Sequence, residues 1–439
     1  MLSTRAPEQT RQRLAWLDAL RGIAALLVVF EHALKPLLPE AREPVKALFE
    51  PGWYGVIVFF LVSGYIVPAS LERRGSVRAF WISRLFRLYP LLGVCVAGMA
   101  LLVAVGWDGL HIWWSDRPAS MVLGHLTMLQ NLLYVPNLVN VLWTLSYEMA
   151  FYLLLTAMFT LGVHRRSVTG ALGFAVVAVL GAAALPVKLL SAGGAGRMLT
   201  VVLVVTALVG GGLTAVLKGS APVRRAGATV LGVTVLGLLA VNQSYPDPWQ
   251  GLLILATMFA GTALYRAEQG EITWTAAGWV ALVPLAWTGL AWGELGLQTA
   301  MAAAWLTFAV GMRLRHRQVP RPLAWLGLVS YSIYLLHPLL LESIERFWPE
   351  PLVVPLNLRL VALACVVGVL LALSALTWRL VEAPAQRLGR RLASASPRPG
   401  SPLPGSEDEN PRRSRPELSG PDLLRGEDDG HAPRRAASS

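Results

Sequence analysis

Twelve long apolar stretches divide this chain, and they constrain its fold more than any other feature of the sequence. A bilayer core of about 30 Å is crossed by about 20 mostly apolar residues in a helix, so each stretch is a candidate transmembrane helix. The chain is 55% hydrophobic and only 15% charged, which excludes an ordinary water-soluble enzyme. We therefore expect an all-α, polytopic membrane helix bundle with about 10–12 transmembrane helices. The stretches lie at residues 15–36, 53–71, 88–106, 142–162, 168–187, 198–217, 226–243, 250–266, 275–292, 297–313, 324–345 and 356–380.

The basic residues collect in alternate loops, and this pattern predicts an orientation. The formal net charge is +12, and loops that face the cytoplasm carry the excess of Lys and Arg. We therefore expect a multi-pass protein of the plasma or inner membrane with both termini in the cytoplasm, and the charge needs no nucleic-acid partner. Lys188 and Arg197 are a weak exception. The expected cytoplasmic groups are Arg5, Arg11 and Arg13; Arg73, Arg74, Arg78, Arg84 and Arg87; His164–Arg166; Lys218, Arg224 and Arg225; Arg266; Arg313, Arg315, Arg317 and Arg321; and Arg387, Arg390 and Arg391.

The two ends of the chain differ in character from the region between them. The first apolar stretch contains Arg21 and is followed by no small-residue cleavage site, so we expect a retained helix after a cytoplasmic N-terminal segment at residues 1–13. The transmembrane domain is expected over residues 14–392. Residues 393–439 are rich in Pro, Ser and Gly and predict a disordered cytoplasmic tail. The two cysteines lie in apolar stretches, so neither a disulfide framework nor a metal site is expected.

The first apolar stretch, LDALRGIAALLVVFEHAL, carries Asp18 and Arg21 near its start and Glu31 and His32 near its end. An ionisable residue inside the membrane costs about 2.5–3.5 kcal/mol and is therefore a candidate for function. Arg21 and His32 are three helical turns plus about 20° apart, so they share one helix face at about 16 Å from each other. The structural alternative is that Arg21 extends to the lipid headgroups and that His32 bonds a neighbouring carbonyl.

A basic pair occurs in WISRLFRLYPLL, where Arg84 and Arg87 are spaced i, i+3. In a helix both guanidinium groups project from the same side and repel each other unless an anion lies between them, and a phosphate suits that place. Because Tyr89 and Pro90 begin an apolar stretch, we expect the pair at the membrane face. The alternative is ordinary basic flanking of a transmembrane helix.

Two later stretches carry polar groups among apolar ones. Glu148 interrupts LWTLSYEMAFYLLL, and His337 follows a line of serines and tyrosines in LGLVSYSIYLLHPLLL. By depth, His32, Glu148 and His337 all fall in the outer half of the membrane, and the three arginines fall on the inner side. A carboxylate there needs a cationic or hydrogen-bonding partner, and His32 or His337 would supply it. For the serines and tyrosines the alternative is ordinary hydrogen bonding between helices.

These residues lie in phrases that resemble the acyltransferase 3 family of integral membrane O-acyltransferases. The resemblance extends over roughly residues 17–388. The chain departs from the family at Met149, where a second acidic residue is common, and at Glu31, where an apolar or aromatic residue is common. Residues from about 168 to 313 carry little motif, and we expect them to help to choose the acceptor. Six phrases match in order: LDALRGIAALLVVFEHA with Arg21 and His32, VFFLVSGYIV, RLFRLYP with Arg84 and Arg87, LWTLSYEMAFYLL with Glu148, LGLVSYSIYLLHPLL with His337, and RLVEAPAQRL with Glu382.

The resemblance implies transfer of an acyl group, most often acetyl, from cytoplasmic acyl-CoA to a hydroxyl of an envelope glycan, a lipid-linked sugar or a secondary metabolite. Acyl-CoA is then a co-substrate, and no cofactor is bound permanently. Some members carry an extracytoplasmic domain that completes the transfer, so we expect this chain either to act alone or to pass its acyl group to a separate extracytoplasmic partner. The alternative is a proton-coupled transporter, because twelve spans with buried His and Glu also suit a carrier.

The resemblance and the chemistry together suggest a role for each candidate residue. His32 removes the proton of the acceptor, because neutral imidazole, with a reference pKa of about 6.5, is a suitable base near neutral pH. Glu148 orients or stabilises the His32 ring, and His337 is a second proton carrier or positions the acceptor. A covalent acyl group on His32 is the alternative route. The expected donor-binding residues are Arg21, Arg84 and Arg87, and the expected supporting residues are Asp18, Ser146 and Tyr331.

Overall fold

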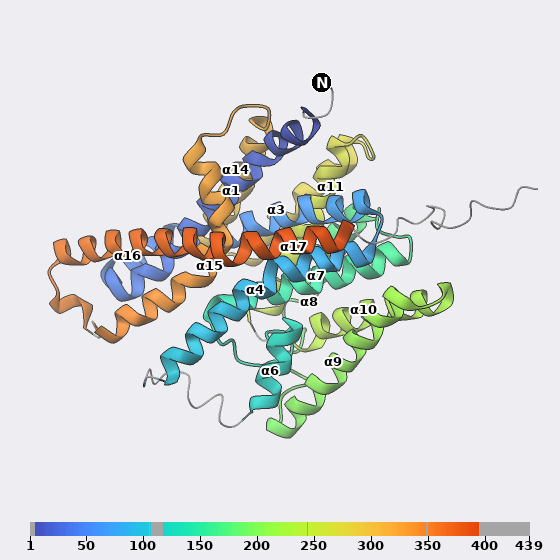
Figure 1. Cartoon of the computed structure of the whole chain (residues 1–439), viewed down its shortest axis with the longest axis horizontal. Coiled ribbons are helices and arrows are strands. Elements are labelled where there is room, and N and C mark those ends of the chain that lie inside the picture. Colours follow the sequence, from blue (N-terminus) through green and yellow to red (C-terminus); the bar gives the residue numbers. More distant parts are fainter. Residues whose placement is uncertain (1–4, 105, 107–116, 244, 348–349, 395–439) are drawn as a thin grey trace, which may run out of the picture. The chain divides into compact units, whose positions relative to one another are not determined.

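The computed structural model describes residues 5–104, 106, 117–243, 245–347 and 350–394, and within them the secondary structure is helical, without strands (Figure 1). This confirms the expected all-α fold. The helices of the first half are α1 (Arg5–Leu37), α2 (Pro39–Leu48), α3 (Pro51–Arg74), α4 (Val77–Ala104), α6 (Pro118–Thr127), α7 (Trp143–Thr160), α8 (Ser167–Gly181) and α9 (Ala195–Lys218). Those of the second half are α10 (Ala221–Val241), α11 (Pro248–Glu268), α12 (Trp274–Gly278), α13 (Leu282–Leu290), α14 (Leu295–Arg313), α15 (Arg321–Phe347), α16 (Leu356–Thr377) and α17 (Ala383–Ser394).

Eleven of the twelve apolar stretches coincide with one helix each, and the stretch at residues 275–292 is divided between α12 and α13. In the described part of the chain, eight helices are long and apolar enough to cross a membrane, so the chain is a multi-pass membrane protein. Helix α8 and the pair α12–α13 are apolar but shorter. Helices α1 and α11 are long enough but carry more polar residues. The structure is therefore compatible with eight to twelve crossings.

Helix α4 begins earlier than the sequence pattern predicts. We expected the third span to start at residue 88, but the helix starts at Val77. Gly75 ends α3 in the left-handed conformation with φ of 61°, and the Ser76 hydroxyl accepts a hydrogen bond from the backbone N–H of Ala79 at 3.2 Å. These two residues close one helix and open the next, so Arg84 and Arg87 lie inside α4 and not before it.

Helix α1 lies against α3 and α15, and its contact with α15 is unusually close. A Cβ atom on Gly327 of α15 would lie 2.0 Å from the carbonyl oxygen of Asp18, and one on Gly22 would lie 2.7 Å from the Cβ of Leu326. Only glycine permits this approach of two helix backbones, as is common between membrane helices. The contact fixes α1 against α15 about three helical turns before the histidine of each helix.

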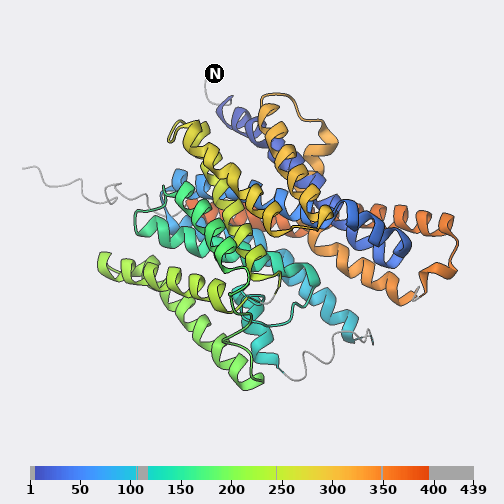
Figure 2. The same cartoon turned by 180° about the vertical axis from the view of Figure 1, so that it is seen from behind.

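Two pairs of consecutive helices are closely associated. Helices α16 and α17 form one nearly continuous rod, joined by a π turn at Trp378–Glu382 (Figure 1). Helices α9 and α10 lie side by side as a hairpin (Figure 2). The predicted N-terminal segment is the first part of α1 from Arg5 onward, and the predicted tail lies outside the described residues after Ser394.

Candidate active site

His32 of α1 and His337 of α15 contact each other directly. The Nδ1 atom of His32 lies 2.7 Å from the Nε2 atom of His337, and the ring centres are 5.0 Å apart. His337 is completely buried, whereas His32 is partly exposed. Of the two rings, His32 is therefore the one that a substrate can reach.

The backbone decides which nitrogen of each neutral ring carries the hydrogen. The carbonyl oxygen of Ile333 lies 3.1 Å from His337 Nδ1 and can only accept, so His337 Nδ1 is the donor. Nε2 of a neutral His337 is then an acceptor, and His32 Nδ1 must donate to it. This assignment leaves Nε2 of a neutral His32 without a hydrogen. That atom has the lone pair that a general base or a nucleophile needs.

Glu31, the residue before His32, contacts a different helix. Its carboxylate accepts a hydrogen bond from the backbone N–H of Gly52, in the first turn of α3. A carboxylate is favourable there because the N-terminus of a helix carries a partial positive charge. Glu31 thus ties α1 to α3, and it is not the partner of His32, as its position on the helix predicts.

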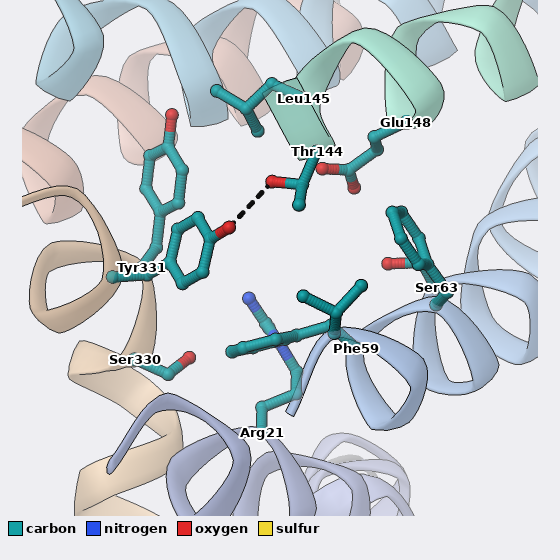
Figure 3. A pocket seen from close by; sticks show the side chains of 11 residues that line it. Arg21, Phe59, Ser63, Thr144, Leu145, Glu148, Ser330 and Tyr331 are labelled. Carbon is teal, nitrogen blue, oxygen red and sulfur yellow. Dashed lines mark hydrogen bonds between the residues drawn. The ribbon is translucent and has the colours of Figure 1, made fainter. Parts of the chain in front are cut away.

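A cavity of about 60 Å³ lies between α1, α3, α7 and α15. Arg21 projects into it from α1, and Glu148 projects into it from α7 on the opposite side (Figure 3). The Thr144 hydroxyl lies 2.8 Å from the Tyr334 hydroxyl at the cavity wall (Figure 3). The volume suffices for a few water molecules or a group of the size of an acetyl, but not for a sugar ring.

The predicted contact of Glu148 with a histidine is wrong. The Glu148 carboxylate instead accepts a hydrogen bond from the Tyr152 hydroxyl, one turn further along α7, and faces the cavity with Arg21. His32 has His337 as its ring partner. Depth along the membrane normal was sufficient to group these residues, but it says nothing of the rotation of α7 about its axis, and this rotation turns Glu148 toward Arg21.

The two arginines of α4 diverge, which corrects the prediction that both project from the membrane face. Arg84 is only 5% exposed. Its guanidinium lies 5.4 Å from the ring centre of Phe80 and 5.5 Å from that of Tyr152, and its Nη2 lies 3.4 Å from the Ser70 hydroxyl. Arg87 is partly exposed, and its charge acts on Arg21. Arg87 is therefore the member of the pair that remains accessible to an anion.

The three supporting residues lie in different surroundings. Asp18 Oδ1 is 4.0 Å from Arg21 Nη1, one turn along the same helix. Tyr331 lines the cavity and donates a hydrogen bond of 3.0 Å to the carbonyl oxygen of Leu88 on α4. Ser146 is buried elsewhere, where its hydroxyl accepts a hydrogen bond of 3.2 Å from the backbone N–H of Asn131. Ser146 thus holds the loop before α7 and does not line the cavity.

Two residues that the sequence reasoning gave no role belong to this site. Tyr152 follows Glu148 at i+4, a spacing that brings side chains together on a helix and that indicates the contact. Glu382 is 3% exposed, accepts a hydrogen bond from the Ser332 hydroxyl, and acts electrostatically on Arg21. No spacing along the chain indicates this second relationship, because Glu382 enters the bundle through the π turn.

Two aromatic residues separate the cavity from the histidine pair. Phe59 and Tyr334 both line the cavity, and their ring centres are 5.5 Å apart. The Tyr334 ring centre also lies 6.0 Å from that of His337. Arg21 and His32 both face α15, as their spacing predicts. Arg21 and the His32 nitrogen with a free lone pair therefore lie on one face of α1, with Phe59 and Tyr334 between the cavity and the histidine pair.

Comparison with known proteins connects this geometry with a family. Residues 14–379 match the model of the acyltransferase 3 family, described as an acyltransferase domain. The chain is 31% identical to nodulation protein 10 of Rhizobium leguminosarum bv. viciae over 182 residues, which cover 37% of this chain and 48% of that protein. It is 31% identical to acyltransferase MdmB of Streptomyces mycarofaciens over 158 residues, which cover 32% of this chain and 38% of that protein.

A third relative, from another group of bacteria, matches over a similar length. The putative O-acetyltransferase SACOL0978 of Staphylococcus aureus (strain COL) is 28% identical over 156 residues, which cover 31% of this chain and 23% of that protein. The chain thus spans less than half the length of the curated relatives it matches. No solved structure matches it.

Proposed function

Because this chain belongs to the acyltransferase 3 family, we propose that it is a membrane O-acyltransferase. It moves an acyl group, in the first instance acetyl, from cytoplasmic acyl-CoA to a hydroxyl of an envelope glycan, a lipid-linked sugar or a secondary metabolite. The observation that carries the proposal is the His32–His337 contact, since it leaves an accessible imidazole nitrogen without a hydrogen. The family match favours this enzyme over the transporter that the sequence left as the alternative.

His32 is the catalytic residue of the proposed reaction. Its Nε2 takes the proton of the acceptor hydroxyl while the hydroxyl oxygen attacks the thioester carbonyl, so that a C–O bond forms and the carbonyl oxygen becomes an oxyanion. The C–S bond then breaks, and the proton on His32 passes to the departing thiolate to give free CoA. In the alternative route, Nε2 itself attacks the carbonyl, the C–S bond breaks with departure of the CoA thiolate, and Nε2 holds the acyl group until the acceptor hydroxyl attacks it and restores the free imidazole. Both routes need the same free lone pair.

His337 acts through His32 and is a positioning residue. It is completely buried and engaged at both ring nitrogens, so it does not reach a substrate. Its role is to hold the His32 ring in one orientation and one tautomer, as the carboxylate does in a catalytic triad. This assignment takes from Glu148 the orienting role that the sequence suggested.

Arg21 and Arg87 are the donor-binding residues of this proposal. Both carry a fixed positive charge, they act on each other electrostatically, and an anionic phosphate between them relieves that repulsion. Arg84 is buried against Phe80 and Tyr152, so it contributes by holding Tyr152, which in turn holds Glu148. The pantetheine arm of the donor then extends from the donor-binding arginines along α1, past the small cavity at Arg21 and Glu148, and brings the acyl end to His32.

The direction of transfer follows from the charge pattern. With both termini in the cytoplasm, Arg21 lies toward the inner side of α1 and His32 toward the outer side, so the acyl group moves outward along one helix face. The acceptor hydroxyl then meets His32 from outside, either on the final acceptor or on a separate extracytoplasmic partner.

Acyl transfer is tested with the purified chain in lipid vesicles. Acetyl-CoA labelled in its acetyl group is added on one side, and an extract of envelope glycans and lipids on the other. The proposal predicts labelled acceptor and one free CoA for each acetyl group transferred. Movement of a solute across the vesicle membrane without any labelled product would contradict the acyltransferase proposal and support the transporter.

A further inference from the structure

A second pocket, of about 250 Å³, lies at the end of the bundle that we expect to face outward. It is formed by the start of α6, the loop between α6 and α7, the first turn of α9 and the loop before α11. Polar and aromatic side chains line most of it: Arg117, Asn131, Tyr134, Asn137 and Tyr245. Unlike the cavity at Arg21, this pocket is large enough to accept a ring of several atoms.

Basic residues surround this pocket, although the positive-inside rule disfavours them on the outer side. Lys188 Nζ lies 3.2 Å from the Tyr134 hydroxyl and 4.8 Å from the centre of its ring. Arg197 donates hydrogen bonds of 2.8 and 3.0 Å to the carbonyl oxygens of Leu190 and Leu189. Arg117 has no carboxylate partner among the described residues, and its contact is Met198 Sδ at 3.9 Å. Arg117 is therefore a cation available to an anionic ligand.

Two further features mark the pocket as a binding site. Asn137 Oδ1 is buried and has no hydrogen-bond partner in the part of the chain that the structure describes. Such an atom costs free energy unless a ligand or water supplies a donor. Tyr134 adopts a left-handed backbone conformation with φ of 60°, which is rare for a bulky residue and occurs mainly at functional sites.

Asn242 holds the pocket walls in place. Its side-chain amide donates to the carbonyl oxygen of Leu132 at 2.8 Å, and its side-chain oxygen accepts from the backbone N–H groups of Leu190 and Ser191 at 2.9 and 3.0 Å. The Ser191 hydroxyl donates to the carbonyl oxygen of Leu133 at 3.0 Å. These bonds join the loop that carries Tyr134 and Asn137 to the loop that carries Lys188, so the site is preorganised.

A row of aromatic rings joins the pocket to the histidine pair. The ring centre of Tyr245 lies 5.2 Å from that of Trp143, which lies 5.9 Å from that of Trp53. Trp53 follows Gly52, whose N–H is bonded to the carboxylate of Glu31 beside His32. The Glu31 charge also acts on Tyr245. The pocket and His32 therefore lie at the same end of the bundle.

We infer that this pocket binds the acceptor, and that the acceptor carries an anionic group on or next to a hydroxylated ring. Arg117 pairs with the anion, Tyr134 and Tyr245 pack against the ring, and Asn137 Oδ1 accepts a hydrogen bond from a ring hydroxyl. The anion is the carboxylate of an acidic sugar or the phosphate of a sugar phosphate, and both place the same chemistry against Arg117. The identification of this ligand as the acceptor rests on the proposed function.

Binding is tested without any acyl donor, by saturation-transfer NMR on the full chain in lipid nanodiscs. The probes are glucuronic acid, glucose 1-phosphate and glucose. We expect at least one acidic probe to bind about tenfold or more tightly than glucose, and Arg117→Gln to lower its affinity about tenfold. Lys188→Gln, which removes the ammonium that contacts Tyr134, is the second variant and should weaken binding of the same probe. Arg225→Gln removes an exposed guanidinium from α10 and is the matched control.

The outcomes separate the two ligand sources and the two proposals. Binding of glucuronic acid alone identifies an acidic sugar, and binding of glucose 1-phosphate alone identifies a sugar phosphate. Equal binding of all three probes, no binding, or an affinity unchanged in both Arg117→Gln and Lys188→Gln would overturn the inference. If an acidic probe binds at Arg117 but acetyl transfer is absent, the ligand site stands and the acyltransferase proposal fails.

Discussion

His32 and His337 lie 305 positions apart in the sequence, yet a ring nitrogen of one is 2.7 Å from a ring nitrogen of the other. The glycine contact between α1 and α15 brings the two helices together, and the Ile333 carbonyl sets the tautomer of His337. His337 is buried and both of its ring nitrogens are engaged, so the free lone pair is on Nε2 of His32. The proposed chemistry depends on this relationship, and it makes the following predictions.

Replacing His337 tests its positioning role. His337→Ala removes the acceptor for the His32 Nδ1–H, so the ring loses its fixed tautomer, and we expect acyl transfer to fall by about 10- to 100-fold. His337→Gln restores an acceptor oxygen and should recover part of that loss. The measurement is kcat and KM for acetyl-CoA in both variants. A loss that appears in KM alone, or an equal loss in both variants, would contradict positioning of His32.

Glu148 and Tyr152 are expected to act together and apart from the histidine pair. Glu148→Gln removes the charge to which the Tyr152 hydroxyl donates, and Tyr152→Phe removes the donor, so their effects on transfer should be less than additive in the double variant. The pH midpoint of transfer should stay in place in Glu148→Gln, because Glu148 does not contact His32. If Glu148→Gln moved the pH midpoint of transfer and His337→Gln did not, Glu148 and not His337 would be the partner of His32.

The close approach of α1 and α15 predicts a strong steric effect. In Gly327→Ala the added methyl would overlap the Asp18 carbonyl oxygen at 2.0 Å, and the resulting strain should cost about 1–3 kcal/mol and separate the helices that carry the histidines. Thermal unfolding in detergent and transfer activity measure the two consequences. Gly368→Ala on α16 is the control, because a Cβ there meets nothing within 4 Å. Equal stability of the two variants would refute the packing argument.

Glu40, on α2 outside the transmembrane segments, predicts a dependence of stability on pH. Arg359 Nη1 donates a hydrogen bond of 2.8 Å to Glu40 on α2, and this bond lowers the pKa of the Glu40 carboxyl below its ordinary value. A carboxyl whose pKa is lower in the folded than in the unfolded protein stabilises the folded state at pH values above the unfolded pKa. This stabilisation is lost as the pH falls through the folded pKa. The melting temperature should therefore drop as the pH falls from neutral through the folded pKa of Glu40, and drop less in Glu40→Gln. An identical pH profile in Glu40→Gln would rule out this contribution.

Composition and periodicity predicted the helices better than the contacts among them. Every apolar stretch except residues 275–292 formed a single helix, because about 20 apolar residues suffice to define one. The spacing of Arg21 and His32 placed both on one face. The start of α4 was missed, since Gly75 and Ser76 cap two helices within a segment whose basic residues resemble a loop.

The candidate site could be predicted as a set of residues but not as an arrangement. The predicted depth in the membrane grouped His32, Glu148 and His337, but it does not give the rotation of each helix about its axis. This rotation brings His32 to His337 and turns Glu148 away from both. Burial of Arg84 depends on Phe80 and Tyr152, which come together only when α4 packs near α7. The contacts between helices arise from tertiary packing, and no spacing along the chain indicates them. The contact of Glu148 with Tyr152 is the exception, because their i, i+4 spacing indicates it.

The central claim is that His32 performs the acyl transfer, and a comparison of the native chain with His32→Ala in nanodiscs tests it most directly. Donor binding is measured by calorimetry with acetyl-CoA, and transfer by release of free CoA in the presence of an acceptor extract. The account predicts that His32→Ala binds acetyl-CoA with nearly native affinity and releases free CoA at less than about one hundredth of the native rate. Native transfer by His32→Ala would contradict it.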